Sequence, residues 1–193
     1  MKTKIAIQGE LGAYSHLAAK EIFGDVDISP CKTFEDVFAL IKSDQNIKTV
    51  IPIENSLAGR VVDVHSLLVK YKPKIIREHF LRIEHCLISN HSSNINKIKY
   101  VKSHSHAISQ CQKNIHSKNL TPIITADTAG SAKLLSENPD DTIAVIASSI
   151  SAEIYKLKIL QNNFEDMEGN TTRFLVMDNS NTVSYTHLTL PTT

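Results

Sequence analysis

A hydroxyl and a guanidinium stand side by side near the C-terminal end of the chain, in the run Asn170-Thr171-Thr172-Arg173-Phe174. A polar, acidic stretch precedes this run and an apolar one follows, which predicts a loop leading into a buried strand. Side chains alternate along a strand, so Thr172 and Phe174 should face one side and Arg173 the other. A hydroxyl donor at the mouth of a buried strand could bind a small anion. A hydroxyl bonded to its own loop and a solvated arginine would give the same pattern.

Polar side chains also follow two other predicted strands. Residues 47–53 are almost continuously apolar, which is typical of a strand buried on both faces, and Glu54-Asn55-Ser56 comes directly after them. Polar groups at the carboxyl end of a strand lie where open α/β sheets bind ligands, although these three could also form a turn and a helix start. A strand at 4–8 leads into Ala13-Tyr14-Ser15, with Ser15 as candidate N-cap of a helix at 17–23. Backbone amides at such a helix start suit an anion.

A fourth polar stretch, residues 103–106, opens a predicted helix that continues through Gln110. Ser103 and Gln110 lie two turns apart on that helix, so both could face one cleft. His104 and His106 diverge on a helix, and no cysteine or acid stands at ligand spacing, so we expect no metal site.

Strands and helices alternate along the chain, which predicts an α/β class with mostly parallel sheets. Residues 75–89 are too weakly helical for a single helix, and we expect an extended segment that crosses between two lobes. The other predicted strands span 4–8, 26–31, 47–53, 98–101, 122–126, 142–147 and 157–160, and predicted helices follow Thr33, Val61, Ser103, Thr128 and Ile150.

Composition excludes several classes of protein. The chain has 193 residues, 41% of them hydrophobic, and a formal net charge of +1, so nothing favours nucleic acid or an anionic membrane as a partner. Three widely spaced cysteines (Cys31, Cys86 and Cys111) fit free thiols in a reducing compartment. No stretch has the length of a membrane span and the N-terminus does not resemble a secretory signal, so we expect a cytoplasmic protein.

Four stretches resemble, in the same order, the motifs of prephenate dehydratases. They are Gly12 to Ser15, Pro52 to Ser56, Ser103 to Cys111 and Thr172 to Phe174, within a match from about Ile5 to Met177. The third stretch departs from the family pattern, because Ser105 and His106 replace a proline and a glutamine.

The resemblance implies a two-lobed, type II periplasmic-binding-protein-like α/β fold with an active site between the lobes. Residues 1–76 and 164–178 would form lobe 1 and residues 77–163 lobe 2. Residues 179–193 show no pattern of the family's regulatory ACT domain, and we expect a non-native or disordered tail. We therefore expect no phenylalanine regulatory site in this chain, and a homodimer formed through the catalytic lobes.

The implied reaction is that of a carbon–oxygen lyase, the conversion of prephenate to phenylpyruvate with loss of carbon dioxide and water, without metal or cofactor. The resemblance assigns Thr172 to catalysis, as the donor that helps the hydroxyl depart. Arg173 is the least secure of the implied binding residues, because it faces away from Thr172 and could form a structural ion pair. The implied substrate-binding residues are Ala13, Tyr14, Ser15, Glu54, Asn55, Ser56, Ser103, Gln110, Asn170, Arg173 and Phe174.

Two alternatives remain open at the level of sequence. An arogenate dehydratase would run the same chemistry on an aminated substrate. A solute-binding module would bind a small anion with the same fold and no chemistry. Asn55 and Gln110 come from different lobes in this interpretation, so we expect them to meet only across the cleft.

Overall fold

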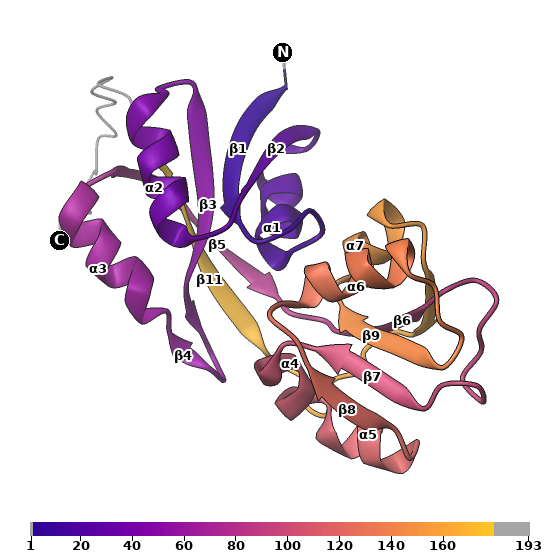
Figure 1. The fold of residues 1–193 in the computed structure, drawn as a ribbon. Coiled ribbons are helices and arrows are strands. Elements are labelled where there is room, and N and C mark those ends of the chain that lie inside the picture. The colour runs from indigo at the N-terminus through magenta and orange to yellow at the C-terminus, as the bar shows by residue number, and fades with distance from the viewer. Residues whose placement is uncertain (1, 180–193) are drawn as a thin grey trace, which may run out of the picture.

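The structure is a computed structural model that describes residues 2–179, and it contains two α/β lobes that lie side by side (Figure 1). The first lobe holds β1 (Thr3–Gln8), α1 (Tyr14–Phe23), β2 (Val26–Cys31), α2 (Phe34–Ser43), β3 (Ile47–Asn55), β4 (Gly59–Arg60), α3 (Val62–Tyr71), β5 (Lys74–Arg82) and β11 (Thr171–Asp178). The second holds β6 (Cys86–Ser89), β7 (Tyr100–Ser103), α4 (Ser105–Gln110), α5 (Gln112–Ser117), β8 (Thr121–Ile124), α6 (Thr128–Glu137), β9 (Ile143–Ala147), α7 (Ser149–Ile154) and β10 (Lys158–Gln161).

Helices cover both faces of the first sheet because its central strands are apolar on both sides. Phe38 of α2 and Val64 of α3 pack on one face with Ile51 of β3. Ala18 of α1 packs on the opposite face with Val50 of the same strand. Helix α2 begins after Thr33, as predicted, and its start is a capping box: Thr33 Oγ1 accepts from the Asp36 amide and Asp36 accepts from the Thr33 amide, both over 3.1 Å.

The second lobe repeats this three-layer arrangement around a smaller, five-stranded sheet. Ile108 of α4 and the fully buried Phe164 pack on one face against Ile146 of β9. Ala132 of α6 packs on the other face against Val145. Each lobe therefore has its own hydrophobic core on both sides of its sheet.

Both sheets are mixed, whereas the sequence favoured mostly parallel pairing. The first has the order β2-β1-β3-β11-β5 with β4 beside β3, and β11 runs antiparallel to both β3 and β5. The second has the order β10-β6-β9-β7-β8, with β6 antiparallel to both neighbours. Apart from the short β4, which pairs antiparallel with β3 in a hairpin, the antiparallel strands β11 and β6 are those that directly follow a crossing between the lobes. The α/β class and the two-lobed architecture are as predicted.

Two short segments connect the lobes and are hydrogen-bonded to each other. The Ile83 amide donates to the Asn170 carbonyl over 2.8 Å, and the Phe164 amide donates to the His85 carbonyl over 2.8 Å. The chain leaves the first sheet only after Arg82, so the predicted crossing near Arg77 falls inside β5. The predicted domain boundaries themselves remain a proposal.

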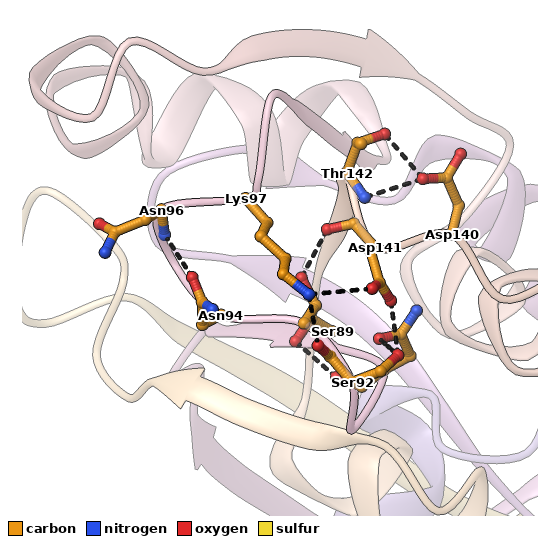
Figure 2. Close-up of polar contacts among 10 residues, drawn as sticks. Ser89, Ser92, Asn94, Asn96, Lys97, Asp140, Asp141 and Thr142 are labelled. Atoms are coloured by element: carbon orange, nitrogen blue, oxygen red, sulfur yellow. Dashed lines mark hydrogen bonds and ion pairs between the residues drawn. The ribbon is translucent and has the colours of Figure 1, made fainter.

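A polar network ties the loop between β6 and β7 to the loop that precedes β9 (Figure 2). Lys97 Nζ donates to Asp141 Oδ2 over 3.2 Å and to the Ser92 carbonyl over 3.1 Å. Ser92 Oγ donates to Asp141 Oδ1 over 2.5 Å. This network lies at the amino ends of β7 and β9. It therefore connects the loops at the end of the second sheet that is opposite the carboxyl ends of these two strands.

Three further expectations concern the start of α1, the C-terminal tail and membrane-spanning helices. Ser15 does not cap α1, because the helix already begins at Tyr14 with Ala13 as N-cap, and Ser15 is buried within it. The predicted tail lies outside the described residues from 180 onward. Between residues 2 and 179, no helix is both long and apolar enough to cross a membrane.

Candidate active site

A cavity of about 550 Å³ lies between the lobes and has walls from both. The first lobe contributes the carboxyl ends of β1 and β3 and the start of β11. The starts of α1, α4 and α6 also border the cavity. Helix starts carry free amide donors, so this arrangement favours an anionic ligand.

Asn55 and Thr172 form the first part of a hydrogen-bonded chain at this cavity. They are register partners on β3 and β11, and Asn55 Nδ2 donates to Thr172 Oγ1 over 2.8 Å. Asn55 Oδ1 accepts from the amides of Leu57 (3.0 Å) and Ala58 (2.8 Å). Backbone amides can only donate, so they fix which side of the Asn55 amide is oxygen. Thr172 is therefore an acceptor from Asn55, and its own proton has no acceptor among the described residues.

Asn170 continues this chain toward the second lobe. Its Oδ1 accepts from Asn55 Nδ2 over 2.6 Å, and its Nδ2 donates to Gln110 Oε1 over 2.9 Å. Asn170 is only 2% exposed, so both hydrogen bonds are shielded from water. Asn55 of the first lobe and Gln110 of the second thus share Asn170 as a partner.

His85 and Tyr14 form the far end of the chain. His85 Nε2 lies 2.8 Å from Gln110 Oε1, and His85 Nδ1 lies 2.6 Å from the Tyr14 hydroxyl. His85 is 3% exposed, and this burial lowers the pKa of its imidazole, which favours the neutral ring. Burial also raises the pKa of the Tyr14 phenol well above its usual value, which keeps the hydroxyl protonated. Both groups are therefore neutral at physiological pH.

Eight residues of the sequence-predicted set line the cavity, although the strands and helices that carry them are far apart in the chain. They are Ala13, Tyr14, Ser15, Asn55, Gln110, Asn170, Thr172 and Phe174.

Four predicted residues lie elsewhere. Ser103 is fully buried at the end of β7, where its hydroxyl donates to the Ile146 carbonyl over 2.6 Å. Arg173 pairs with Glu78 of β5 through Nε and Nη2, both at 2.7 Å, on the strand face opposite Thr172. Glu54 is exposed, and Ser56 Oγ accepts from the Thr171 amide over 3.0 Å outside the cavity lining.

Several lining residues were absent from the sequence-predicted set. His85 sits in the crossing segment, and its alternation with Leu81 and Ile83 was the one local sign that it turns inward. Asp127 precedes a predicted helix, a position that could have indicated a cap facing the cleft. The lining residues missed at the level of sequence include Gln8, Arg60, His85, His104, His106, Asp127 and Thr128.

Three titratable groups of the lining, Asp127, His104 and His106, have contacts within the protein. Asp127 caps α6 by accepting from the Gly130 amide, so its carboxylate points toward the helix start. The His104 and His106 rings meet edge to face with centroids 5.0 Å apart. No group of three or more histidines, cysteines, aspartates or glutamates suited to a metal occurs within residues 2–179.

A close contact holds the two lobes together beside the start of α1. The hydroxyls of Ser148 (2.6 Å) and Ser151 (2.9 Å) donate to the Gly12 carbonyl, and Tyr155 donates to the Leu11 carbonyl over 2.8 Å. Gly12 has φ +89°, and a Cβ there would lie 2.9 Å from Ser151 Cα. The contact therefore needs glycine both for its backbone conformation and for the close approach of α7.

Comparison with known proteins gives consistent matches. The family model of prephenate dehydratase matches residues 5–182. The chain is 40% identical over 171 residues to "Prephenate dehydratase" of Methanocaldococcus jannaschii, covering 86% of this chain and 61% of the relative. It is 37% identical over 172 residues to "Bifunctional N-acyl-homoserine lactone acylase/prephenate dehydratase" of Komagataeibacter europaeus, covering 89% and 61%. It is 36% identical over 177 residues to "Arogenate dehydratase/prephenate dehydratase 2, chloroplastic" of Arabidopsis thaliana, covering 91% and 46%. The chain thus spans about half to three fifths of the length of these relatives.

Two solved structures are also similar. One, described as "GqqA- a novel type of quorum quenching acylases", has a TM-score of 0.85 and 36% identity over 92% of this chain and 64% of that chain. The prephenate dehydratase of Staphylococcus aureus subsp. aureus Mu50 has a TM-score of 0.79 and 28% identity over 94% of this chain and 67% of that chain.

Proposed function

The chain belongs to the prephenate dehydratase family, and we propose that it converts prephenate to phenylpyruvate with loss of carbon dioxide and water, as a carbon–oxygen lyase. One observation carries the proposal beyond family membership. Asn55 Nδ2 donates to Thr172 Oγ1 at the interlobe cavity, which leaves the threonine proton available to a ligand. A hydroxyl held in this way is a donor aimed at an acceptor that the protein does not itself supply.

Aromatisation drives the proposed reaction once the ring carboxylate and hydroxyl leave. The departing hydroxyl gathers negative charge as its bond to carbon breaks, and a hydrogen bond from Thr172 stabilises that charge. A threonine hydroxyl is a weak acid, so Thr172 orients or relays a proton rather than releasing one to solvent. Thr172 is the catalytic residue of this proposal.

The remaining lining residues bind and enclose the substrate. The amide of Gln110 and the helix start at Ala13-Tyr14-Ser15 offer donors for the two carboxylates of prephenate. Phe174 contributes an apolar wall beside Thr172. Asn55 and Asn170 orient these donors through the hydrogen-bonded chain. Glu54, Ser56, Ser103 and Arg173 support the surrounding structure in this proposal.

Arogenate is the second candidate substrate, because relatives 33–36% identical to this chain are named arogenate dehydratases. Steady-state kinetics on prephenate and arogenate, followed by the absorbance of phenylpyruvate or by release of phenylalanine, measures both activities side by side. A higher kcat/KM for prephenate supports the proposal, and a higher value for arogenate replaces it with the second candidate. Binding without turnover of either substrate would indicate a solute-binding module.

Assembly and location form a separate part of the proposal. We propose a homodimer that forms through the catalytic lobes, since the edge strand β5 exposes Ile75, Ile76 and Phe80. Analytical ultracentrifugation should give twice the chain mass, and a monomer at micromolar concentration would contradict this. We also propose a reducing, cytoplasmic location, which the three free cysteines favour.

A further inference from the structure

Six side chains from both lobes form one hydrogen-bonded chain: Thr172, Asn55, Asn170, Gln110, His85 and Tyr14. Each member is an amide, a hydroxyl or an imidazole, and each such group has distinct donor and acceptor atoms. The direction of every hydrogen bond in the chain therefore follows once one group is fixed.

Asn55 fixes the direction. Its Oδ1 accepts from two backbone amides, Leu57 and Ala58, which cannot accept in return. Its Nδ2 must then donate to Thr172 Oγ1 and Asn170 Oδ1, with a longer contact of 3.4 Å to the Thr171 carbonyl. Asn170 consequently presents Nδ2 to Gln110, and Gln110 must present Oε1 in reply.

His85 meets the same oxygen of Gln110 from the other side. Gln110 Oε1 already accepts from Asn170, so a neutral His85 can bond it at 2.8 Å only with its proton on Nε2. Nδ1 is then an acceptor for the Tyr14 hydroxyl, whose proton has two acceptors within reach: His85 Nδ1 at 2.6 Å and the Glu84 carbonyl at 3.2 Å. The shorter contact makes Nδ1 the main acceptor of that proton. With the proton on Nδ1, His85 Nε2 and Gln110 Oε1 would both be acceptors and could not form a hydrogen bond.

The amide nitrogen of Gln110 is left over from these contacts. Its two N–H groups have no partner among the described residues, and Gln110 lines the cavity. If the imidazole proton were on Nδ1, His85 Nε2 would be an acceptor and would bind the amide nitrogen of Gln110. That nitrogen would then point toward His85 and away from the cavity. Holding Gln110 Oε1 therefore keeps the amide donors free for a ligand.

We propose that His85 is a positioning residue, neutral with its proton on Nε2, that turns the amide donors of Gln110 toward the substrate. The cavity then presents a hydroxyl donor from the first lobe and an amide donor pair from the second. This combination suits a ligand with acceptors on two sides, such as a hydroxyl and a carboxylate. The kinetic part of this proposal rests on the proposed function, whereas the position of the proton does not.

The position of the proton is tested on the unmodified protein by ¹⁵N–¹H correlation spectra of the histidine ring nitrogens. The chain has nine histidines, so the His85 signals are assigned by their loss in His85→Gln or His85→Asn. We expect a protonated Nε2 and an unprotonated Nδ1 for His85 at neutral pH. A proton on Nδ1, or on both nitrogens, would overturn the proposal whether or not the protein turns over prephenate.

The positioning role is tested by two substitutions, each of which keeps a polar group near only one of the two ring nitrogens of His85. His85→Gln places an amide at the reach of Nε2 and can still donate to Gln110, whereas His85→Asn reaches only the place of Nδ1. We expect His85→Asn to raise KM by about tenfold, the loss of one hydrogen bond to a charged group, with kcat nearly unchanged. His85→Gln should restore most of that loss.

Thermal unfolding of both variants separates binding from stability. Equal KM values for the two folded variants would show that His85 only fills space, and would overturn the proposed role. If the unmodified protein turns over neither prephenate nor arogenate, the proposed function fails. In that case the affinity of both variants for prephenate, measured by calorimetry, takes the place of KM with the same expected order.

Discussion

Asn55 and Thr172 are register partners on antiparallel strands, and the amide of Asn55 donates to the hydroxyl of Thr172 over 2.8 Å. Two backbone amides hold Asn55 in the orientation that makes it the donor. The hydroxyl of Thr172 is thereby left with a proton to give at an interlobe cavity.

Asn55→Asp should lower kcat by about a hundredfold, the typical effect of removing a positioned donor. The new carboxylate would still accept from Leu57 and Ala58, but its second oxygen would accept the proton of Thr172. Steady-state kinetics on prephenate measures the change. Asn94→Asp is the matched control, because Asn94 also accepts from a backbone amide, that of Asn96, in a loop remote from the cavity. Equal kcat values for the two variants would contradict the assignment of Asn55 as donor and Thr172 as acceptor.

Gln110→Ala and Ser103→Ala should have opposite signatures, although sequence placed both residues in the binding set. Gln110 lines the cavity, so its truncation should raise KM by about tenfold or more. Ser103 bonds the Ile146 carbonyl in the buried sheet, so its truncation should cost about 1 kcal/mol of unfolding free energy with KM unchanged. Steady-state kinetics and urea unfolding give the KM and the unfolding free energy of each variant. A raised KM in Ser103→Ala would place that residue in the site.

Gly12→Ala should destabilise the protein far more than Gly24→Ala. Both glycines have positive φ, +89° and +75°, so both substitutions strain the backbone. Only at Gly12 would the new Cβ also meet neighbouring backbone, 2.9 Å from Ser151 Cα, whereas nothing lies within 4 Å at Gly24. We expect the Gly12 variant to lose about 2 kcal/mol more in urea unfolding. Equal losses would mean that the lobes are not held by this contact.

The free energy of unfolding should fall as the pH drops below about 6.5. Burial lowers the pKa of His16, His85 and His104, so the unfolded chain binds more protons than the folded one in that range. Stability therefore rises with pH there and levels off above the unfolded pKa. His85→Gln should make this dependence shallower, as measured by urea unfolding between about pH 5 and pH 8. An unchanged slope of unfolding free energy against pH would show that His85 does not contribute to this dependence.

Most elements of the fold were predicted from local patterns of residues. The capping box of Thr33 and Asp36 and the apolar run at 47–53 depend on neighbours in the chain, and both features are present in the structure. The direction of β11 could not be read in this way, because it depends on how often the chain crosses between lobes. Ser103 was misplaced on a helix because a strand that ends in polar residues resembles a helix start.

The cavity residues followed from sequence only where a motif contained them. Thr172 and Asn55 lie within such motifs, and the structure places them together at the cavity. His85 lies in a crossing segment with no motif of its own, and its partners Tyr14 and Gln110 are 71 and 25 residues away in the chain. The direction of each hydrogen bond depends on backbone amides at Leu57 and Ala58, which no side-chain pattern reveals.

If Thr172 is the catalytic donor of a prephenate dehydratase, removing its hydroxyl must lower kcat for prephenate, which steady-state kinetics of Thr172→Ala measures. Thr171→Ala is the matched control, since it removes the same atoms one residue earlier, outside the cavity lining. Thr172→Ala should lower kcat by about a hundredfold or more with little change in stability, and Thr171→Ala should remain near the unmodified value. Full turnover by a folded Thr172→Ala variant would remove Thr172 from the mechanism.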